Sequence, residues 1–304
     1  MQAEPTQSTI SRPWRTVTIV LTTLAIAALA GAVGAAAVIY SGIYNVAATR
    51  QHQQWVYTLL EDAMRQSVRL RARRIDTPPD LATSDRRLVQ GAACFRDKCV
   101  QCHGAPGVAQ GDIGKSMQPL PGPLADANQR WNARELYWLT RHGIKMSGMP
   151  AWEFRLSDDE LWNVVALLQR LPDLTPQQYA VLASAPPLQV APGGSASASC
   201  GRRNEAAALD TPGDIRRGEA ALYQYACNAC HTIPGITGSR ANVGPPLEGI
   251  ARRTLIAGKL DNTPHNMVRW LMHTKEVAPQ SAMPQMGLSE RDAKDIAAYL
   301  GTLR

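Results

Sequence analysis

One long apolar run near the start of the chain differs from everything that follows it. No charged residue lies between Arg15 and Arg50, and residues 16–40 are rich in Ala, Val, Leu and Ile. A helix over these residues rises about 37 Å at ~1.5 Å per residue, enough to cross a hydrocarbon core of ~30 Å. Because Arg12 and Arg15 precede the run, the positive-inside tendency predicts that residues 1–45 form a cytoplasmic N-terminus and a transmembrane anchor.

A cleaved signal peptide is the alternative for the same segment. Ala-rich stretches around residues 34–38 and 46–48 offer candidate cleavage sites. The apolar run is far longer than the ~7–15 residues of a signal core, which favours a retained anchor. Both interpretations export the rest of the chain.

A second helical pattern follows at residues 51–75. Its apolar side chains recur at three- and four-residue spacing, at Trp55, Val56, Leu59, Leu60, Ala63, Met64 and Val68. Several arginines follow between Arg65 and Arg74. Residues 46–83 are therefore predicted to hold a juxtamembrane amphipathic helix. It either contacts headgroups or a partner subunit, or packs on the domain that follows, and we favour the packing.

The rest of the pattern is repeated. Segments 156–171 and 288–303 align without a gap, and each opens with a Ser-x-x-acid capping pattern before apolar residues at helical spacing. Strand signals are few, and Pro/Gly-rich loops fill the middle of each half. Residues 184–211 are rich in Ala, Pro, Gly and Ser and predict a linker. The chain is therefore predicted to be all-α, with domains at 84–183 and 212–304.

Charge and cysteine usage narrow the function. The formal charge of +7 and pI of about 9.3 fit an acidic protein partner or anionic headgroups, and the charge is too diffuse to indicate nucleic acid. Four of the six cysteines form two Cys-x-x-Cys pairs. Each pair is followed at once by a histidine, in Cys99-x-x-Cys102-His103 and Cys227-x-x-Cys230-His231.

This Cys-x-x-Cys-His motif is the signature of covalent haem attachment. Two thiols at this separation form thioethers with the porphyrin vinyl groups, and the adjacent histidine reaches the iron from the proximal face. A bare Cys-x-x-Cys also suits a redox dithiol or half a zinc site. The following histidine, the duplication and the export signal favour haem. The sequence therefore predicts two covalently bound haem c groups, with His103 and His231 as iron ligands.

Each iron needs a second axial ligand, and a methionine thioether is usual in electron-carrying haems. Each half offers a Met-Pro after a loop, at Met149 and Met283, and the proline restricts the local backbone. Met146 and Met286 are rivals close by, and His142 is a rival that would make the first haem bis-histidine.

On these motifs the chain resembles the class I cytochrome c family in its membrane-anchored, tandem dihaem form, over roughly residues 86–304. In the second half the resemblance rests on Cys227-Asn-Ala-Cys-His-Thr-Ile-Pro-Gly, Gly244-Pro-Pro-Leu-Glu-Gly249, Asn262-Thr-Pro, Trp270-Leu, Ala282-Met-Pro and Asp295-Ile-Ala-Ala-Tyr-Leu. In the first half it rests on Cys99-Val-Gln-Cys-His-Gly and Gly143-Ile-Lys-Met-Ser-Gly-Met-Pro-Ala-Trp.

The resemblance implies a small helical fold around each haem, in which the N- and C-terminal helices of each domain cross. The residues expected at the crossings are Gly91 and Phe95 with Leu167, and Gly218 and Tyr223 with Tyr299.

It also implies roles around the second haem. The Pro245 carbonyl would orient the proximal histidine, and Trp270 with Arg252 or Arg253 would lie near the propionates. In the first half the loop 119–124 departs from the family's Gly-Pro-x-Leu pattern, so the resemblance assigns no residue there.

Two cysteines lie outside the motifs. Cys94 falls in the helix before the first haem, where bulk rather than sulfur is expected. It is either a buried hydrophobic residue or the partner of linker residue Cys200 in a disulfide, which an oxidising compartment permits.

The predicted function is electron transfer rather than catalysis, because two irons with both axial positions filled leave no place for a substrate. The carrier would pass single electrons from a quinol-oxidising complex or a periplasmic dehydrogenase to a soluble cytochrome or a terminal oxidase, free or as a subunit. It would lie in a bacterial inner membrane with both haem domains in the periplasm, and no small-molecule substrate is expected. A dihaem peroxidase is the alternative, and it needs an iron with a displaceable ligand. A haem-based sensor would need a signalling domain, which the sequence does not indicate.

Overall fold

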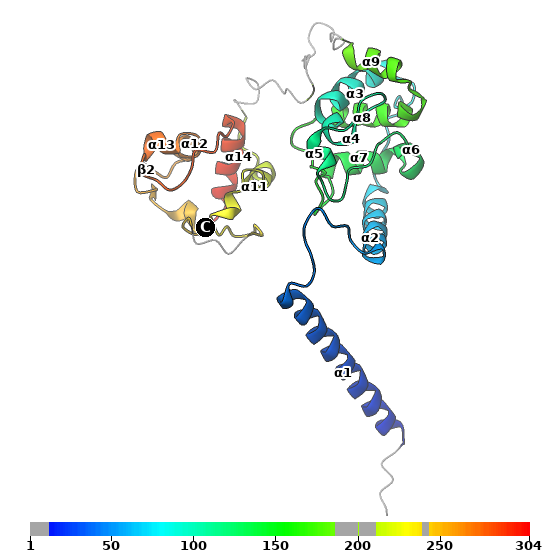
Figure 1. Ribbon diagram of the computed structural model, residues 1–304. Helices are drawn as coiled ribbons and strands as arrows, with labels where there is room; N and C mark the ends of the chain where they lie inside the picture. The colour runs from blue at the N-terminus through cyan, green and yellow to red at the C-terminus, as the bar shows by residue number, and fades with distance from the viewer. Residues whose placement is uncertain (1–11, 186–199, 201–210, 239–242) are drawn as a thin grey trace, which may run out of the picture.

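The computed structural model describes residues 12–185, 200, 211–238 and 243–304, and its regular secondary structure is almost entirely helical (Figure 1). The prediction of an all-α architecture is confirmed. In the described residues, strands are limited to the short antiparallel pair β1 (Leu255–Ile256) and β2 (Leu260–Asp261).

The first helix, α1 (Arg12–Ser41), stands apart from the two helical domains (Figure 1). Its segment Trp14–Ser41 has a mean hydropathy of 2.2, and none of it is buried. By length and composition it is able to cross a membrane.

The amphipathic helix α2 (Gln54–Ala72) uses only part of its apolar stripe. Val68 and Ala72 near its C-terminal end are buried, and this end lies against α7 (Ala133–His142). Trp55 is 67% exposed, and Leu59 and Leu60 are also exposed. The predicted packing on the following domain therefore holds for the C-terminal end of α2 and is wrong for the N-terminal end.

Two helical domains follow, each with its own apolar core. The remaining elements of the first are α3 (Asp85–Lys98), α4 (Val100–His103), α5 (Asp112–Lys115), α6 (Ala127–Arg130), α8 (Asp158–Arg170), η1 (Leu171–Asp173) and α9 (Pro176–Ser184). Those of the second are α11 (Ile215–Gln224), η2 (Cys227–Ala229), η3 (Ile250–Arg252), α12 (Pro264–Met272), α13 (Thr274–Val277) and α14 (Glu290–Leu300), besides the two strands.

In each domain the first and last long helices cross at a glycine. A Cβ at Gly91 of α3 would overlap the Asn163 carbonyl oxygen of α8, and a Cβ at Gly218 of α11 would overlap the Asp295 carbonyl oxygen of α14. Glycine is therefore required at both crossings, since any side chain would separate the helices. The crossing expected from the family resemblance is present in both domains.

One residue expected at these crossings is wrong. Phe95 is fully buried, but Tyr223 is 43% exposed and Leu222 is buried in its place. Counted from the crossing glycine, Leu222 is the equivalent of Phe95. The difference arises because the second domain has one extra residue, Ala226, in a left-handed conformation (φ 52°) before the first cysteine of its Cys-x-x-Cys-His motif.

The last long helix of each domain begins at a capping serine, as its sequence pattern predicts. Ser157 accepts a hydrogen bond from the Glu160 amide at the start of α8, and Ser289 accepts one from the Asp292 amide at the start of α14. A serine cap satisfies amides that the first turn of a helix leaves without a partner.

A disulfide joins Cys94 to Cys200, with the two Cα atoms 5.0 Å apart. Cys94 is also buried, at 3% exposure, so the two expectations for this residue hold together. The bridge fastens one position of the predicted linker to α3, where α9 also packs and Tyr179 meets the Phe95 ring edge-on.

Candidate functional site

The first Cys-x-x-Cys-His motif lies where α3 ends and the short helix α4 begins. The His103 amide donates to the Cys99 carbonyl 2.9 Å away, so the motif forms a single turn. Cys99 is buried, and Cys102 and His103 are half-buried. Both cysteines are free, in contrast to Cys94.

The His103 ring is oriented by a backbone carbonyl. Its Nδ1 lies 2.9 Å from the Gly122 oxygen, where an Nδ1–H donates. Burial lowers the pKa of His103, and the hydrogen bond to Gly122 opposes this shift. A neutral ring that donates through Nδ1 keeps the Nε2 lone pair available for a metal, which is the state an iron ligand needs.

The second motif follows an interruption of the helix rather than a continuous helix. After α11 ends, Ala226 turns the backbone and η2 carries Cys227. His231 Nδ1 lies 2.7 Å from the Pro245 oxygen. A Cβ at Gly244 would overlap the His231 ring, so the loop that supplies the carbonyl passes directly against the imidazole.

The family resemblance assigned no counterpart of Pro245 in the first domain, and Gly122 takes that position. The leucine two residues later was the available signal, since Gly122-Pro-Leu124 matches Pro245-Pro-Leu247. Leu247 is buried and Leu124 packs on the first core, so both leucines anchor the acceptor loop.

Both Met-Pro pairs lie in the same kind of turn. The Met149 amide donates to Ser147 Oγ at 3.2 Å, and the Met283 amide donates to Ser281 Oγ at 3.1 Å. Sequence reasoning missed these serines, although the shared Ser-x-Met-Pro string was visible. A side chain that caps its own backbone in this way fixes the turn that carries the methionine.

Met146, the rival in the first domain, does not share this turn. It is 94% exposed and has a positive φ of 60°, whereas Met149 is half-buried. Met286, the rival in the second domain, packs against the second core, as Met283 does. A further methionine, Met117, lies with its sulfur against Gly148, and no sequence signal marked it because only tertiary packing brings it there.

The other expected residues around the second site lie in different settings. Trp270 of α12 is buried in the second core. Arg252 folds back over Gly249. Arg253 donates to the Pro246 carbonyl at 2.6 Å and therefore stabilises the loop that holds Pro245.

His142, the histidine rival in the first domain, has a partner of its own. Its Nδ1 lies 3.4 Å from a Glu153 oxygen, and its ring lies against Trp138 with centroids 5.0 Å apart. Burial lowers the pKa of His142, and the Glu153 carboxylate opposes this shift.

The first thiol of each motif lies in a setting that does not favour the thiolate of a reactive dithiol. Burial raises the pKa of Cys99 to about 12, with the nearby Cys102 adding to the shift, and burial also raises the pKa of Cys227. Reactive dithiols have lowered rather than raised thiol pKa values.

The donor set in each domain fits a c-type haem. Each domain offers two free thiols for thioethers, an imidazole with its Nδ1 engaged by a carbonyl, and a thioether on a capped turn. Nitrogen and thioether sulfur are the axial donors of cytochrome haems.

Comparison with known proteins finds cytochrome c domains at both motifs. A family model described as "Cytochrome C oxidase, cbb3-type, subunit III" matches residues 86–168, and one described as "Cytochrome c" matches residues 215–304. A protein of Alkalihalophilus pseudofirmus named cytochrome c oxidase subunit 2 is 30% identical over 89 residues, which are 29% of this chain and 25% of that protein. The chain thus spans about a quarter of that relative's length. A solved structure of cytochrome c2 from Rhodobacter sphaeroides is 25% identical, covers 30% of this chain and 96% of its own, and has a TM-score of 0.25.

Proposed function

This chain belongs to the class I cytochrome c family and carries two of its domains in tandem, and from that premise we propose that it is a membrane-anchored dihaem electron carrier. Cytochrome c domains bind haem and transfer electrons. The haem iron supplies one-electron chemistry, and the protein sets the axial ligands and the surroundings of each iron.

The covalent attachment that we propose uses both motifs in full. Cys99 and Cys102 hold the first haem by thioethers, and Cys227 and Cys230 hold the second. His103 and His231 would bind the irons through Nε2, because each donates its Nδ1–H to a backbone carbonyl.

Met149 and Met283 complete the two iron sites in this proposal. The observation that carries the assignment is the shared Ser-x-Met-Pro turn, which Met146 and Met286 lack. A thioether on a fixed turn would be a well-placed ligand, and thioether ligation raises the potential. With His and Met both engaged, the residues would leave no open position for a substrate, and the bound haem would supply one-electron transfer.

The partners we propose are redox proteins. The oxidase-type family model over the first domain and the oxidase-subunit relative support a place next to a terminal oxidase, as acceptor or as complex. A quinol-oxidising complex or a periplasmic dehydrogenase would supply the electrons. The mild positive charge of this chain fits an acidic docking surface on the electron donor or on the acceptor.

The anchor supports a location on the outer side of a bacterial inner membrane. The span Trp14–Ser41 follows Arg12, and thioether attachment belongs with an exported domain. The same compartment suits the Cys94–Cys200 disulfide.

Haem counting after loss of one motif at a time tests the proposal. Replacing Cys99 and Cys102 together by Ala should halve the covalently bound haem per chain, and so should replacing Cys227 and Cys230. Covalent haem is measured by denaturing gel staining and by the alkaline pyridine spectrum. An unchanged haem content in either variant, or turnover of peroxide with an electron donor by the native chain, would contradict the proposal.

A further inference from the structure

In the part of the chain that the structure describes, three pairs of side chains join the two domains. Arg155 of the first domain places Nη1 3.0 Å from Asp292 Oδ1 and Nη2 2.5 Å from Gln224 Oε1. Arg216 of the second domain places Nη2 3.0 Å from Glu153 Oε1. Among the described residues, the hydrogen-bonding partners of both guanidinium groups all lie on the opposite domain.

The carboxylates that accept these hydrogen bonds are also held by residues of their own domains. Asp292 is 7% exposed and also accepts from Tyr225 Oη at 2.8 Å. Burial acts to raise the pKa of Asp292, but its hydrogen bond to Tyr225 and the charge of Arg155 outweigh it and hold that pKa below the usual value. A largely buried carboxylate kept ionised and shared with an arginine from the other domain is a specific contact rather than a chance surface pair.

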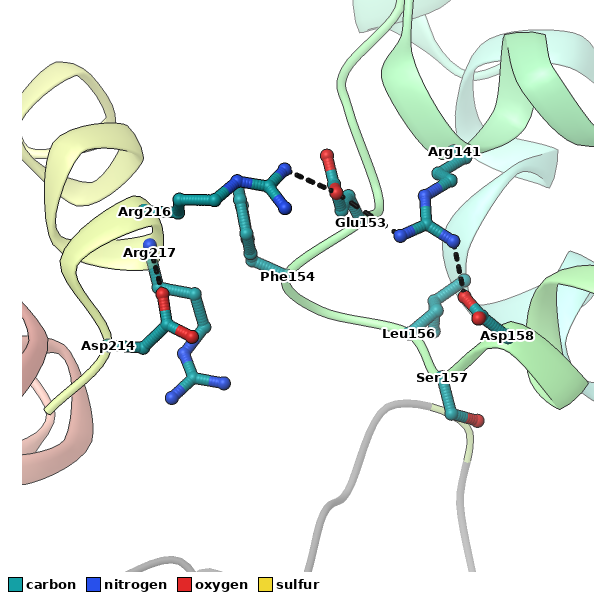
Figure 2. A pocket seen from close by; sticks show the side chains of 9 residues that line it. All are labelled: Arg141, Glu153, Phe154, Leu156, Ser157, Asp158, Asp214, Arg216 and Arg217. Atoms are coloured by element: carbon teal, nitrogen blue, oxygen red, sulfur yellow. Dashed lines mark hydrogen bonds and ion pairs between the residues drawn. The ribbon is translucent and has the colours of Figure 1, made fainter. Parts of the chain in front are cut away.

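Glu153 of the first domain is also a carboxylate, and it bonds to arginines of both domains. It accepts from Arg141 of its own domain at 3.2 Å and from Arg216 of the second domain, so it lies between two guanidinium groups (Figure 2). Beside it is a cavity of about 370 Å³ lined largely by charged residues of both domains, among them Arg141, Asp158, Asp214 and Arg217. A contact of this composition depends on charge rather than on apolar burial.

The contacts also fall on the segments that lead to the iron ligands. Glu153 and Arg155 follow the Met149-Pro turn, and Gln224 lies just before the second haem motif. The segment that follows Met149 in the first domain is therefore hydrogen-bonded to a residue just before the haem motif of the second domain.

The Cys94–Cys200 bridge shortens the covalent tether between the domains. Without it the chain between α9 and α11 is residues 185–214, and with it the stretch between Cys200 and α11 is residues 201–214. Because the effective concentration of a tethered partner falls roughly as the −3/2 power of tether length, the bridge raises it about threefold.

We propose that these contacts form an electrostatic docking surface by which the second haem domain binds the first, and that the disulfide favours the docked state by shortening the tether. The inference about docking stands on the contacts between the domains alone, while its use, electron exchange between the two haems, rests on the proposed function. The docked pair is opened by high ionic strength, since the arginine side chain of each pair is exposed to solvent and the Debye length falls to ~3 Å at ~1 M salt.

Hydrogen exchange on the full chain in mild detergent tests the docking. The readout is amide protection in peptides covering residues 150–157 and 214–226. The variant Arg155→Glu/Arg216→Glu places like charges against Asp292 and Glu153, and we expect exchange in both peptides to become at least about tenfold faster. The wild type at ~1 M salt should show the same change.

The matched control is Arg170→Glu/Lys259→Glu, which changes the net charge equally. Arg170 pairs with Asp173 of its own domain, and Lys259 lies beside the β1–β2 pair. This control should exchange like the wild type. Equal exchange in the wild type and in Arg155→Glu/Arg216→Glu at low salt would overturn the proposal.

The tether is tested by Cys94→Ala/Cys200→Ala. At low salt we expect the docked fraction to survive, and the salt concentration that opens it to fall in line with a threefold lower effective concentration. An unchanged salt midpoint would refute the role of the bridge. Haem content and the visible spectrum are recorded on every sample, so that a protein that docks without the expected haems refutes the proposed function and leaves the docking intact.

Discussion

The two cytochrome c domains share the residues proposed to hold a haem and differ in almost everything that surrounds those residues. Both cross their terminal helices at a glycine, engage the proximal imidazole by a loop carbonyl, and carry the methionine on a Ser-x-Met-Pro turn. The first domain runs from α3 almost directly into its motif and is braced by α9, α2 and a disulfide. In the second domain the backbone turns at Ala226 before the motif, and there is no disulfide among the described residues of this domain.

This difference shows which features are required by haem chemistry and which by position in the molecule. The repeated features all act on the donor atoms or on the helix pair behind them. The features that are not repeated fasten the first domain to the segments before and after it. In the docking proposal, the ion pairs then hold the second domain to this more heavily braced first domain.

The largest effect is expected at the shared helix crossings. Gly91→Val and Gly218→Val each place a side chain on a backbone carbonyl of the opposing helix, and overpacking of this kind costs about 3 kcal/mol or more. Thermal unfolding followed at each haem should show that each variant destabilises its own domain. Equal loss in both domains from either single substitution would show that they unfold as one unit.

Removal of the disulfide is expected to have the next largest effect, and this effect should fall on the first domain. Cys94→Ala/Cys200→Ala is expected to destabilise the first domain by about 2–4 kcal/mol and to leave unfolding of the second nearly unchanged. Chemical denaturation with separate signals for each haem measures this. A shift confined to the second domain would contradict the assignment of the bridge to α3.

Acid should act first on the second domain and its docking contacts. The pKa of Asp292 is lower in the folded protein than in the unfolded chain, so its contribution is present above the unfolded pKa and is lost as pH falls through the lowered value. We expect this stability to fall progressively below about pH 4, and Asp292→Asn to remove that part of the pH dependence. Identical acid titrations of the wild type and Asp292→Asn would exclude this role.

The smallest expected effect lies in the repeated turns. Ser147→Ala and Ser281→Ala each remove one hydrogen bond to a methionine amide, which costs about 0.5–1.5 kcal/mol. The loss should appear as easier displacement of the axial methionine by added imidazole at the matching haem only. Ser116→Ala, at an exposed serine outside both turns, is the control.

Sequence patterns predicted the helices and the haem motifs well, because capping serines, apolar periodicity and Cys-x-x-Cys-His are local signals. Equating Tyr223 with Phe95 failed because the left-handed Ala226 adds a residue that spacing alone does not reveal. Gly122 was missed since a backbone carbonyl has no residue signature, and only the leucine two positions later marks the loop. The Arg155–Asp292 pair joins residues far apart in the chain, so no local pattern indicates it.

The central claim is that Met149 and Met283 hold the two irons opposite His103 and His231. The most direct measurement is the sulfur-to-ferric-iron charge-transfer band of the oxidised full-length protein, compared among single Met→Ala variants. We predict that Met149→Ala and Met283→Ala each remove about half of the band and lower one of the two potentials, while Met146→Ala and Met286→Ala leave both unchanged. A full band in Met149→Ala or Met283→Ala, or its absence from the native protein, would contradict the account.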